Sequence, residues 1–243
     1  MDGLAYTLHG TKPITEISLE MEEEKAVQNN LADQNQAENV LVFNAKHSLS
    51  RSFEQWQKLL QKEKIKRFLV VEKKHSSKKN FRFLYFINIF ETIQIMQKHY
   101  LLFKNYLGKE FDPATLVFEI EDENSLFWSK MFYEKPSVQS VSLWGVLYGY
   151  GLENAYPFSL FFQKFANKKA KAFFSDLINR TQKYFFSEKV DKNLSSQSFP
   201  LPAFRSFLEN DPHKEKYRKE REKIKKIYRK KDLSTVVFDT LYH

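Results

Sequence analysis

Three polar side chains that lie close together in the sequence, Tyr150, Glu153 and Asn154, could bind a ligand. They share a stretch with Gly149 and Gly151, whose spacing predicts a tight turn between two helices. At such a junction the free N–H groups of the second helix could hold an anion or a polar ligand group. The alternative is that Asn154 only caps this helix and that Glu153 lies in solvent. We favour this structural interpretation because capping accounts for the same residues.

A second group of candidate residues forms a strongly basic block near the end of the sequence. Residues 213–231 carry 11 Lys and Arg against 3 Glu, a net charge of +8. Such a block could bind the phosphates of a nucleic acid or another anionic surface. Tyr217 and Tyr228 are interleaved in the sequence with its Lys and Arg residues. The candidate contact residues are Lys214, Lys216, Arg218, Lys219, Arg221, Lys225, Lys226, Arg229, Lys230 and Lys231.

Several familiar chemistries have no matching residues in this sequence. There is no cysteine, which excludes disulfides, thiolate nucleophiles and zinc–thiolate or iron–sulfur sites. The phosphate-binding, HExxH and GxSxG patterns do not occur. The acids between Glu119 and Glu123 lack the spacing of an EF-hand loop and predict a solvated loop. We therefore expect no catalytic residues, no metal and no cofactor, and we favour a protein that is not an enzyme.

The elements that would position these residues are predicted to be mainly helical. Only 6 Gly and 7 Pro in 243 residues favour helices over many short turns, and the 16% of aromatic residues indicate a globular core. The centre of this core is predicted at 136–165, as two consecutive buried helices joined by the Gly-Tyr-Gly turn. Gly145 and Gly149 share one helical face and would let another backbone approach closely.

The fold class predicted from the remaining segments is mainly α (α+β), a multi-helix globular domain with a small β-hairpin near residues 67–87. Asn88 and Asp112 are predicted helix N-caps, and Gly108 is a predicted helix end. The basic helix has a narrow apolar edge that should pack weakly. The predicted helices span residues 52–65, 89–107, 113 onwards, 168–186, 203–210 and 212–231.

Charge divides the chain into three predicted regions. Residues 1–39 hold eight acids and two Lys and are expected to be a flexible acidic segment, with a marginal helix at 16–27. Residues 40–210 form the helical globular domain, whose basicity is accounted for by the Phe, Lys, Asn, Ile and Tyr enrichment typical of AT-rich genomes. Residues 211–243 form a basic helical C-terminal extension. The longest uncharged run, 136–152, is too short and polar to predict a transmembrane helix.

The segments ENSLFWSKMF and SLWGVLYGYGLENAYPF resemble an uncharacterised family of envelope or secreted proteins from obligate intracellular bacteria, some with lipoprotein-type leaders. The resemblance covers residues 50–170 and includes Phe86–Phe103. This chain has no Cys to lipidate, and no signal peptide is visible, although a leader could have been removed. The shared features are Phe127-Trp128, Gly145, Gly149-Tyr150-Gly151 and Asn154-Ala155.

The resemblance and the missing catalytic patterns together predict a non-enzymatic helical protein that interacts with a protein partner. It implies a location in the bacterial envelope or outside the cell rather than in the cytoplasm. The alternative function is binding of nucleic acid or an anionic membrane surface through the basic helix at 213–231. Salt-dependent binding that is lost without these residues would distinguish the two.

Overall fold

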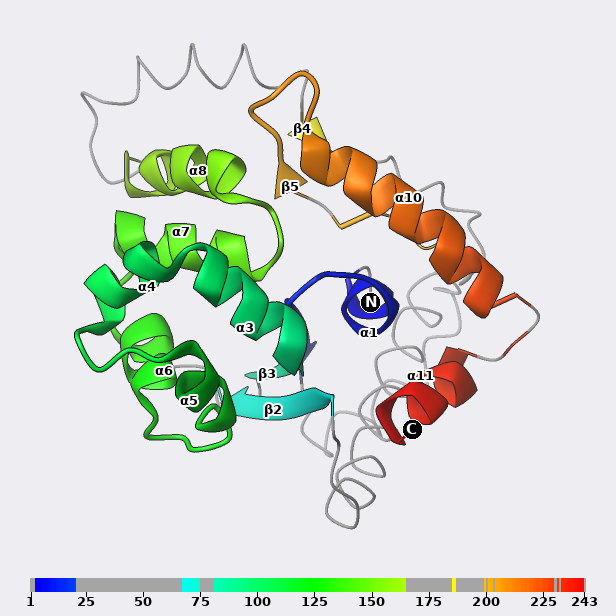
Figure 1. Cartoon of the computed structure of the whole chain (residues 1–243), viewed down its shortest axis with the longest axis horizontal. Helices are drawn as coiled ribbons and strands as arrows, with labels where there is room; N and C mark the ends of the chain where they lie inside the picture. The colour runs from blue at the N-terminus through cyan, green and yellow to red at the C-terminus, as the bar shows by residue number, and fades with distance from the viewer. Residues whose placement is uncertain are drawn as a thin grey trace, which may run out of the picture.

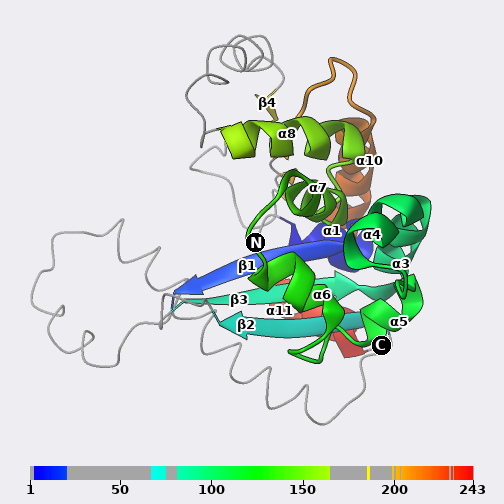
Figure 2. The ribbon, with the colours of Figure 1, turned by 90° about the vertical axis from the view of Figure 1, so that its left-hand side faces the viewer.

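A mainly α (α+β) architecture surrounds one small antiparallel sheet in the computed structural model of this chain (Figure 1). Helices α3 to α7 pack on one side of the sheet and α1 and α11 on the other, whereas α8 and α10 lie farther out, beyond the edge strand β1 (Figure 2). The predicted fold class is thus confirmed. The structure describes residues 3–20, 67–74, 81–164, 185–186, 199, 201–202, 204–229, 231 and 233–242.

The sheet has three strands in the order β1-β3-β2 (Figure 2). Strands β2 (Phe68–Lys74) and β3 (Phe81–Asn88) form the predicted hairpin, with Phe68 opposite Asn88. Strand β1 (Ile14–Glu20) pairs with the other edge of β3 and places Glu16 opposite Tyr85. The central strand β3 therefore receives hydrogen bonds from a segment more than sixty residues earlier in the chain as well as from its hairpin neighbour.

The start of the chain corrects two predictions. Residues 4–20 are not a flexible acidic segment, because they form helix α1 (Leu4–His9) and strand β1, and β1 replaces the first part of the predicted helix at 16–27. Only two of the eight acids of residues 1–39 lie between 3 and 20, so the average charge concealed an apolar beginning. Leu4 and Leu8 are buried against Phe68, Leu84 and Phe86 of the sheet. Residues 21–39 lie outside the described part of the chain.

The local signals for the helices after the sheet are largely confirmed. Asn88 caps α3 by accepting a hydrogen bond from Glu91 N at 3.3 Å, and Asp112 caps α5 by accepting one from Thr115 N at 2.8 Å. Gly108, at φ +113°, ends α4 as predicted. The predicted single helix at 89–107 is two helices, because the backbone leaves the helical region at His99. These elements are α3 (Ile89–Lys98), α4 (Tyr100–Leu107), α5 (Pro113–Phe118), α6 (Leu126–Trp128) and a π-helical turn (Ser129–Tyr133).

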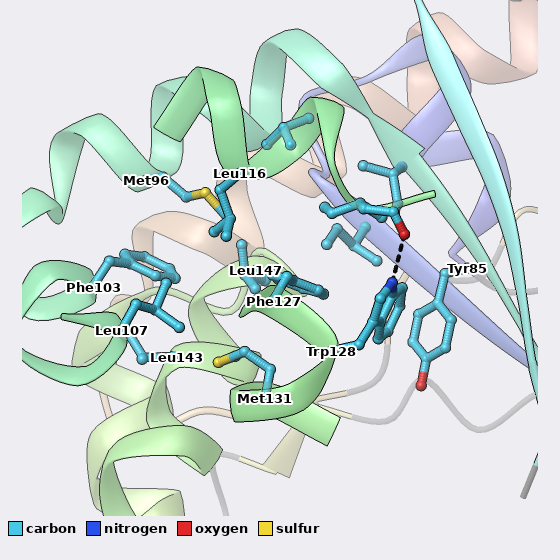
Figure 3. Packing of buried hydrophobic residues seen from close by; sticks show 14 of the residues in the cluster. Tyr85, Met96, Phe103, Leu107, Leu116, Phe127, Trp128, Met131, Leu143 and Leu147 are labelled. Atoms are coloured by element: carbon cyan, nitrogen blue, oxygen red, sulfur yellow. Dashed lines mark hydrogen bonds between the residues drawn. The ribbon is translucent and has the colours of Figure 1, made fainter. Parts of the chain in front are cut away.

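The central stretch forms the two predicted helices, α7 (Val138–Leu147) and α8 (Leu152–Lys164). Gly149 lies beyond the end of α7, at φ +79°, so the prediction that it shares a helical face with Gly145 is wrong. A Cβ atom on Gly145 would lie 2.5 Å from the Cβ of Ala155, so this glycine allows the two helices to approach closely. The helices pack on a core that includes Met96, Phe103, Leu143 and Trp128 (Figure 3). Its largest side chain, Trp128, donates a hydrogen bond from Nε1 to Ile120 O at 2.5 Å, which satisfies its buried polar atom.

The end of the chain forms α10 (Pro212–Ile227) and α11 (Leu233–Tyr242), preceded by two short paired strands, β4 (Phe185–Phe186) and β5 (Phe204–Arg205). The predicted helix at 203–210 is wrong because 204–205 pair as a strand, and 185–186, the end of the predicted helix at 168–186, form the other strand. The rest of that helix, apart from its described end, and the helix at 52–65 lie outside the described residues.

Helix α10 is not weakly packed. Its apolar edge is narrow, but Tyr217, Ile224 and Tyr228 are all at most 1% exposed, because α1 and neighbouring loop residues close over them. Both α10 and α11 contact α1. Residues 212–242 therefore join the first residues of the chain in one packed unit, in place of the predicted separate extension.

Candidate functional site

The predicted turn between α7 and α8 has the tight geometry that its glycines require. Gly149 and Gly151 have φ values of +79° and +77°, in the left-handed region that strongly favours glycine. Backbone hydrogen bonds from Gly149 N to Val146 O at 2.9 Å and from Tyr150 N to Gly145 O at 3.0 Å close the end of α7. The chain then starts α8 at Leu152.

The first turns of helix α10 occupy this site. Tyr217 donates a hydrogen bond from its hydroxyl to Gly149 O at 2.9 Å, and His213 Nε2 lies 2.9 Å from Glu153 Oε1. A Cβ atom on Gly149 would overlap the Tyr217 hydroxyl, and one on Gly151 would overlap the His213 ring. We call Gly149, Gly151, Glu153 and Asn154 the α10 socket, because these four residues receive the side chains that begin α10.

Asn154 has a different role from the predicted one. It lies inside α8, which begins two residues earlier, so it does not cap that helix. Its fully buried amide donates from Nδ2 to Tyr150 O and to Asp211 Oδ2, both at 2.9 Å, and its Oδ1 accepts from Phe207 N at 2.9 Å. Asp211 in turn caps α10 by accepting from His213 N at 2.8 Å. Asn154 therefore joins the turn, the loop before α10 and the α10 cap.

Glu153 is not simply a solvated side chain either. Its side chain is 42% exposed and pairs with His213. Burial raises the pKa of this carboxyl, but its hydrogen bonds and the His213 ring outweigh that effect and the pKa lies below the usual range. The carboxylate thus remains charged at neutral pH and holds the start of α10 to the turn.

A buried polar cluster beside the turn was not predicted. Lys12 is only 4% exposed, donates to Ile14 O and Thr15 Oγ1, and lies 5.5 Å from the centre of the Tyr148 ring. Tyr148 donates to Glu16 Oε2 at 2.5 Å. Burial lowers the pKa of Lys12 to about 7, partly opposed by Glu16, and burial raises the pKa of Tyr150 to about 12.

This cluster connects strand β1 to the end of α7, because Tyr148 donates to Glu16 and Lys12 lies over the Tyr148 ring. The amine of Lys12 is itself hydrogen-bonded to Ile14 and Thr15 of β1. Sequence reasoning missed it because Lys12 and Glu16 belong to the region predicted to be flexible. The available signal was the set of apolar residues Leu4, Leu8, Ile14, Ile17 and Leu19, which was masked by the many acids that follow residue 20.

The predicted basic residues divide between two sides of α10. Lys214, Lys216 and Arg221 are half-buried, and Lys216 Nζ lies 3.5 Å from Thr11 O. Lys230 lies outside the described residues. We define the outer face of α10 by the exposed bases, which include one residue that the prediction omitted, Lys223: they are Arg218, Lys219, Lys223, Lys225, Lys226, Arg229 and Lys231.

The tyrosines of α10 are unavailable for stacking on nucleobases. Tyr217 and Tyr228 are 0% and 1% exposed, and Tyr217 packs edge-to-face against Tyr6 with ring centres 5.5 Å apart. Two exposed acids lie among the seven exposed bases, Glu215 beside Arg218 and Glu222 at 3.3 Å from Lys225 Nζ. The outer face therefore presents a net charge of +5 and no aromatic side chain.

Other candidate features do not form sites within the described residues. The acids Glu119, Glu121, Asp122 and Glu123 are all exposed, as expected for a solvated loop. Across the described ranges, no three His, Asp or Glu side chains are grouped so that they could hold a metal ion. None of the helices described combines the length and the apolar character needed to cross a membrane.

Comparison of the chain with protein-family models, with curated proteins and with solved structures gives no match.

Proposed function

We propose that this chain is a non-enzymatic interaction protein that binds an anionic partner through the outer face of α10. The observation that carries this proposal is that seven Lys and Arg side chains are exposed on and just after a helix whose opposite side is buried in the fold. A helix anchored in this way holds its charges in place before a partner arrives, which lowers the ordering cost of binding. Clustered positive charge also raises the rate of encounter with anions.

A polyanion column tests this function. The full chain should be retained on immobilised heparin and elute with rising salt, because the contacts are between exposed charges. Replacing Lys219, Lys226 and Arg229 with Gln should lower the salt concentration needed for elution. The matched control replaces three exposed lysines elsewhere, Lys74, Lys109 and Lys135, and removes the same total charge. Equal elution of the two variants would show that net charge, and not α10, determines retention.

A second candidate function is interaction with a protein partner in the bacterial envelope or outside the cell, as the family resemblance implies. Three large apolar side chains on consecutive helices are exposed and would be available to such a partner: Phe90 is 59% exposed, Leu101 72% and Phe118 65%. Cell fractionation combined with a photo-crosslinking residue at position 118 tests this candidate. A defined crosslinked partner in the envelope fraction would support it, and a purely cytosolic location would count against it.

A further inference from the structure

We propose that the outer face of α10 binds the sugar–phosphate backbone of double-stranded nucleic acid without reading its base sequence. This inference rests on the proposed function and names the partner for the same surface. It depends on three features of α10: a row of unpaired lysines, the absence of exposed aromatic side chains on the outer face, and the packing of its other side against α1 and the socket.

The lysine row consists of Lys219, Lys223 and Lys226. Their spacing of four and three residues places them along one side of the helix. Within the described chain none of the three forms an ion pair, whereas Arg218 and Lys225 pair with Glu215 and Glu222. The row rises about 10 Å along the helix axis, at 1.5 Å per residue. One strand of a duplex carries a charge about every 3.4 Å, so the row spans about three phosphates.

Single-stranded nucleic acid fits this surface less well than a duplex. Proteins that bind single strands stack successive bases on exposed aromatic side chains, and this stacking supplies much of their affinity. The tyrosines of α10 point inward, where Tyr217 bonds to Gly149 O and Tyr228 packs against Phe199. With charge contacts alone, a rigid row of lysines matches the rigid backbone of a duplex better than a flexible strand that binding would have to order.

An anionic membrane surface also fits less well. Helices that bind membranes bury an apolar face between the lipid headgroups, in addition to their charge contacts. The apolar side of α10, Tyr217, Ile224 and Tyr228, is already buried against other parts of this chain, including Tyr6 and Ala5 of α1. The outer face can therefore offer lipid only electrostatic contact.

The packing of α10 along one side is the reason why we expect its outer face to contact the backbone and not to read the base sequence. A recognition helix enters the major groove so that its side chains reach the base edges. One long side of α10 is held against α1 and by the socket, and in Figure 1 the helix lies along the edge of the molecule with α1 beside it. Phosphate contacts position a protein on nucleic acid but carry no direct sequence information.

Binding of the full chain to four probes tests the inference: two 24-base-pair duplexes of unrelated sequence, one of their single strands, and vesicles containing anionic lipid. We expect equal affinity for the two duplexes and weaker binding to the single strand and to vesicles. The logarithm of the duplex binding constant should fall with the logarithm of salt with a slope of about −3 to −5, which is a weakening of roughly 60-fold to 1,000-fold between 50 and 200 mM salt.

The triple variant Lys219→Gln, Lys223→Gln and Lys226→Gln should reduce this slope by about 3, since three phosphate contacts are removed. The control Lys74→Gln, Lys109→Gln and Lys135→Gln should leave the slope close to that of the unchanged chain. All six residues are exposed, so both variants should fold, which circular dichroism and thermal unfolding would verify.

The outcomes separate the two levels of the proposal. Tighter binding to the single strand, a difference between the two duplex sequences, or binding to vesicles alone would overturn the duplex-backbone inference and leave the anionic-partner function in place. An unchanged slope in the triple variant would overturn the assignment to the lysine row. Failure to bind every probe together with failure to bind heparin would overturn the proposed function itself.

Discussion

The two sides of α10 have opposite characters, although the sequence presents them as one basic block. On the inner side Tyr217, Ile224 and Tyr228 are buried, and His213 and Asp211 bond to the socket. On the outer side the bases are exposed and most of them have no partner in the described structure. The inner side determines how the helix packs in the fold, and the outer side determines which partner it can bind. Substitutions on the two sides should therefore affect different measurements.

The largest expected effect separates two neighbouring residues of α10. Replacing the fully buried Ile224 with Ala should lower the free energy of unfolding by about 2–4 kcal/mol, because it leaves a cavity between α10 and α1. Replacing the adjacent exposed Lys223 with Ala should change it by at most about 0.5 kcal/mol. Urea unfolding measures both. Similar losses in the two variants would mean that α10 has no distinct inner side.

The next effect concerns the socket. Replacing Gly149 with Ala should cost about 2–3 kcal/mol of unfolding free energy, because the new Cβ combines left-handed strain with overlap of the Tyr217 hydroxyl. Tyr217→Phe provides the control, because it removes the hydroxyl that a Cβ on Gly149 would overlap. In the Tyr217→Phe background Gly149→Ala should cost only the left-handed strain, about 1–2 kcal/mol. Equal costs in the two backgrounds would show that overlap with the Tyr217 hydroxyl adds nothing at the turn.

A smaller effect should appear as pH dependence on the inner side. His9 Nε2 lies 3.1 Å from the Tyr228 hydroxyl, and burial, assisted by Arg67, lowers the pKa of His9 from 6.5 to about 4. Between these values the unfolded chain binds more protons than the folded one, so this group makes stability fall as pH falls from 6.5 to 4. The variant His9→Gln should show a shallower decline over this interval, measured as unfolding free energy at several pH values. An identical decline would exclude His9 as a contributor.

The smallest effect on stability is expected on the outer face, where the effect on binding should be largest. The triple variant at Lys219, Lys223 and Lys226 should keep its melting temperature within about 2 °C of the unchanged chain, because solvated side chains contribute little to folding. In the same preparation it should elute from heparin at a lower salt concentration than the unchanged chain. A large fall in melting temperature would show that the lysine row supports the fold.

Local signals predicted much of this structure, and long-range pairing accounts for most of what they missed. The caps at Asn88 and Asp112 and the helix end at Gly108 were predictable because each depends on residues within one or two turns. Strand β1 was not, since its partner β3 lies far along the chain and the surrounding acids suggested disorder.

The candidate site shows the same division. The glycine turn was predictable from spacing, but its contacts with Asp211, His213 and Tyr217 join residues some sixty positions apart. The basic block was predictable from charge alone. Which bases are exposed depends on how the helix is rotated, and that rotation is set by the burial of Ile224 and the two tyrosines.

The packing of α1 between the sheet and the last helices also sets the order in which the protein can be completed during synthesis. Leu4 and Leu8 share a buried cluster with Val237 and Leu241, which are synthesised about 230 residues later. At about 5–20 residues per second, these first apolar side chains await their final neighbours for roughly 10–50 seconds. This buried cluster can therefore close only after the chain has been synthesised as far as residue 241.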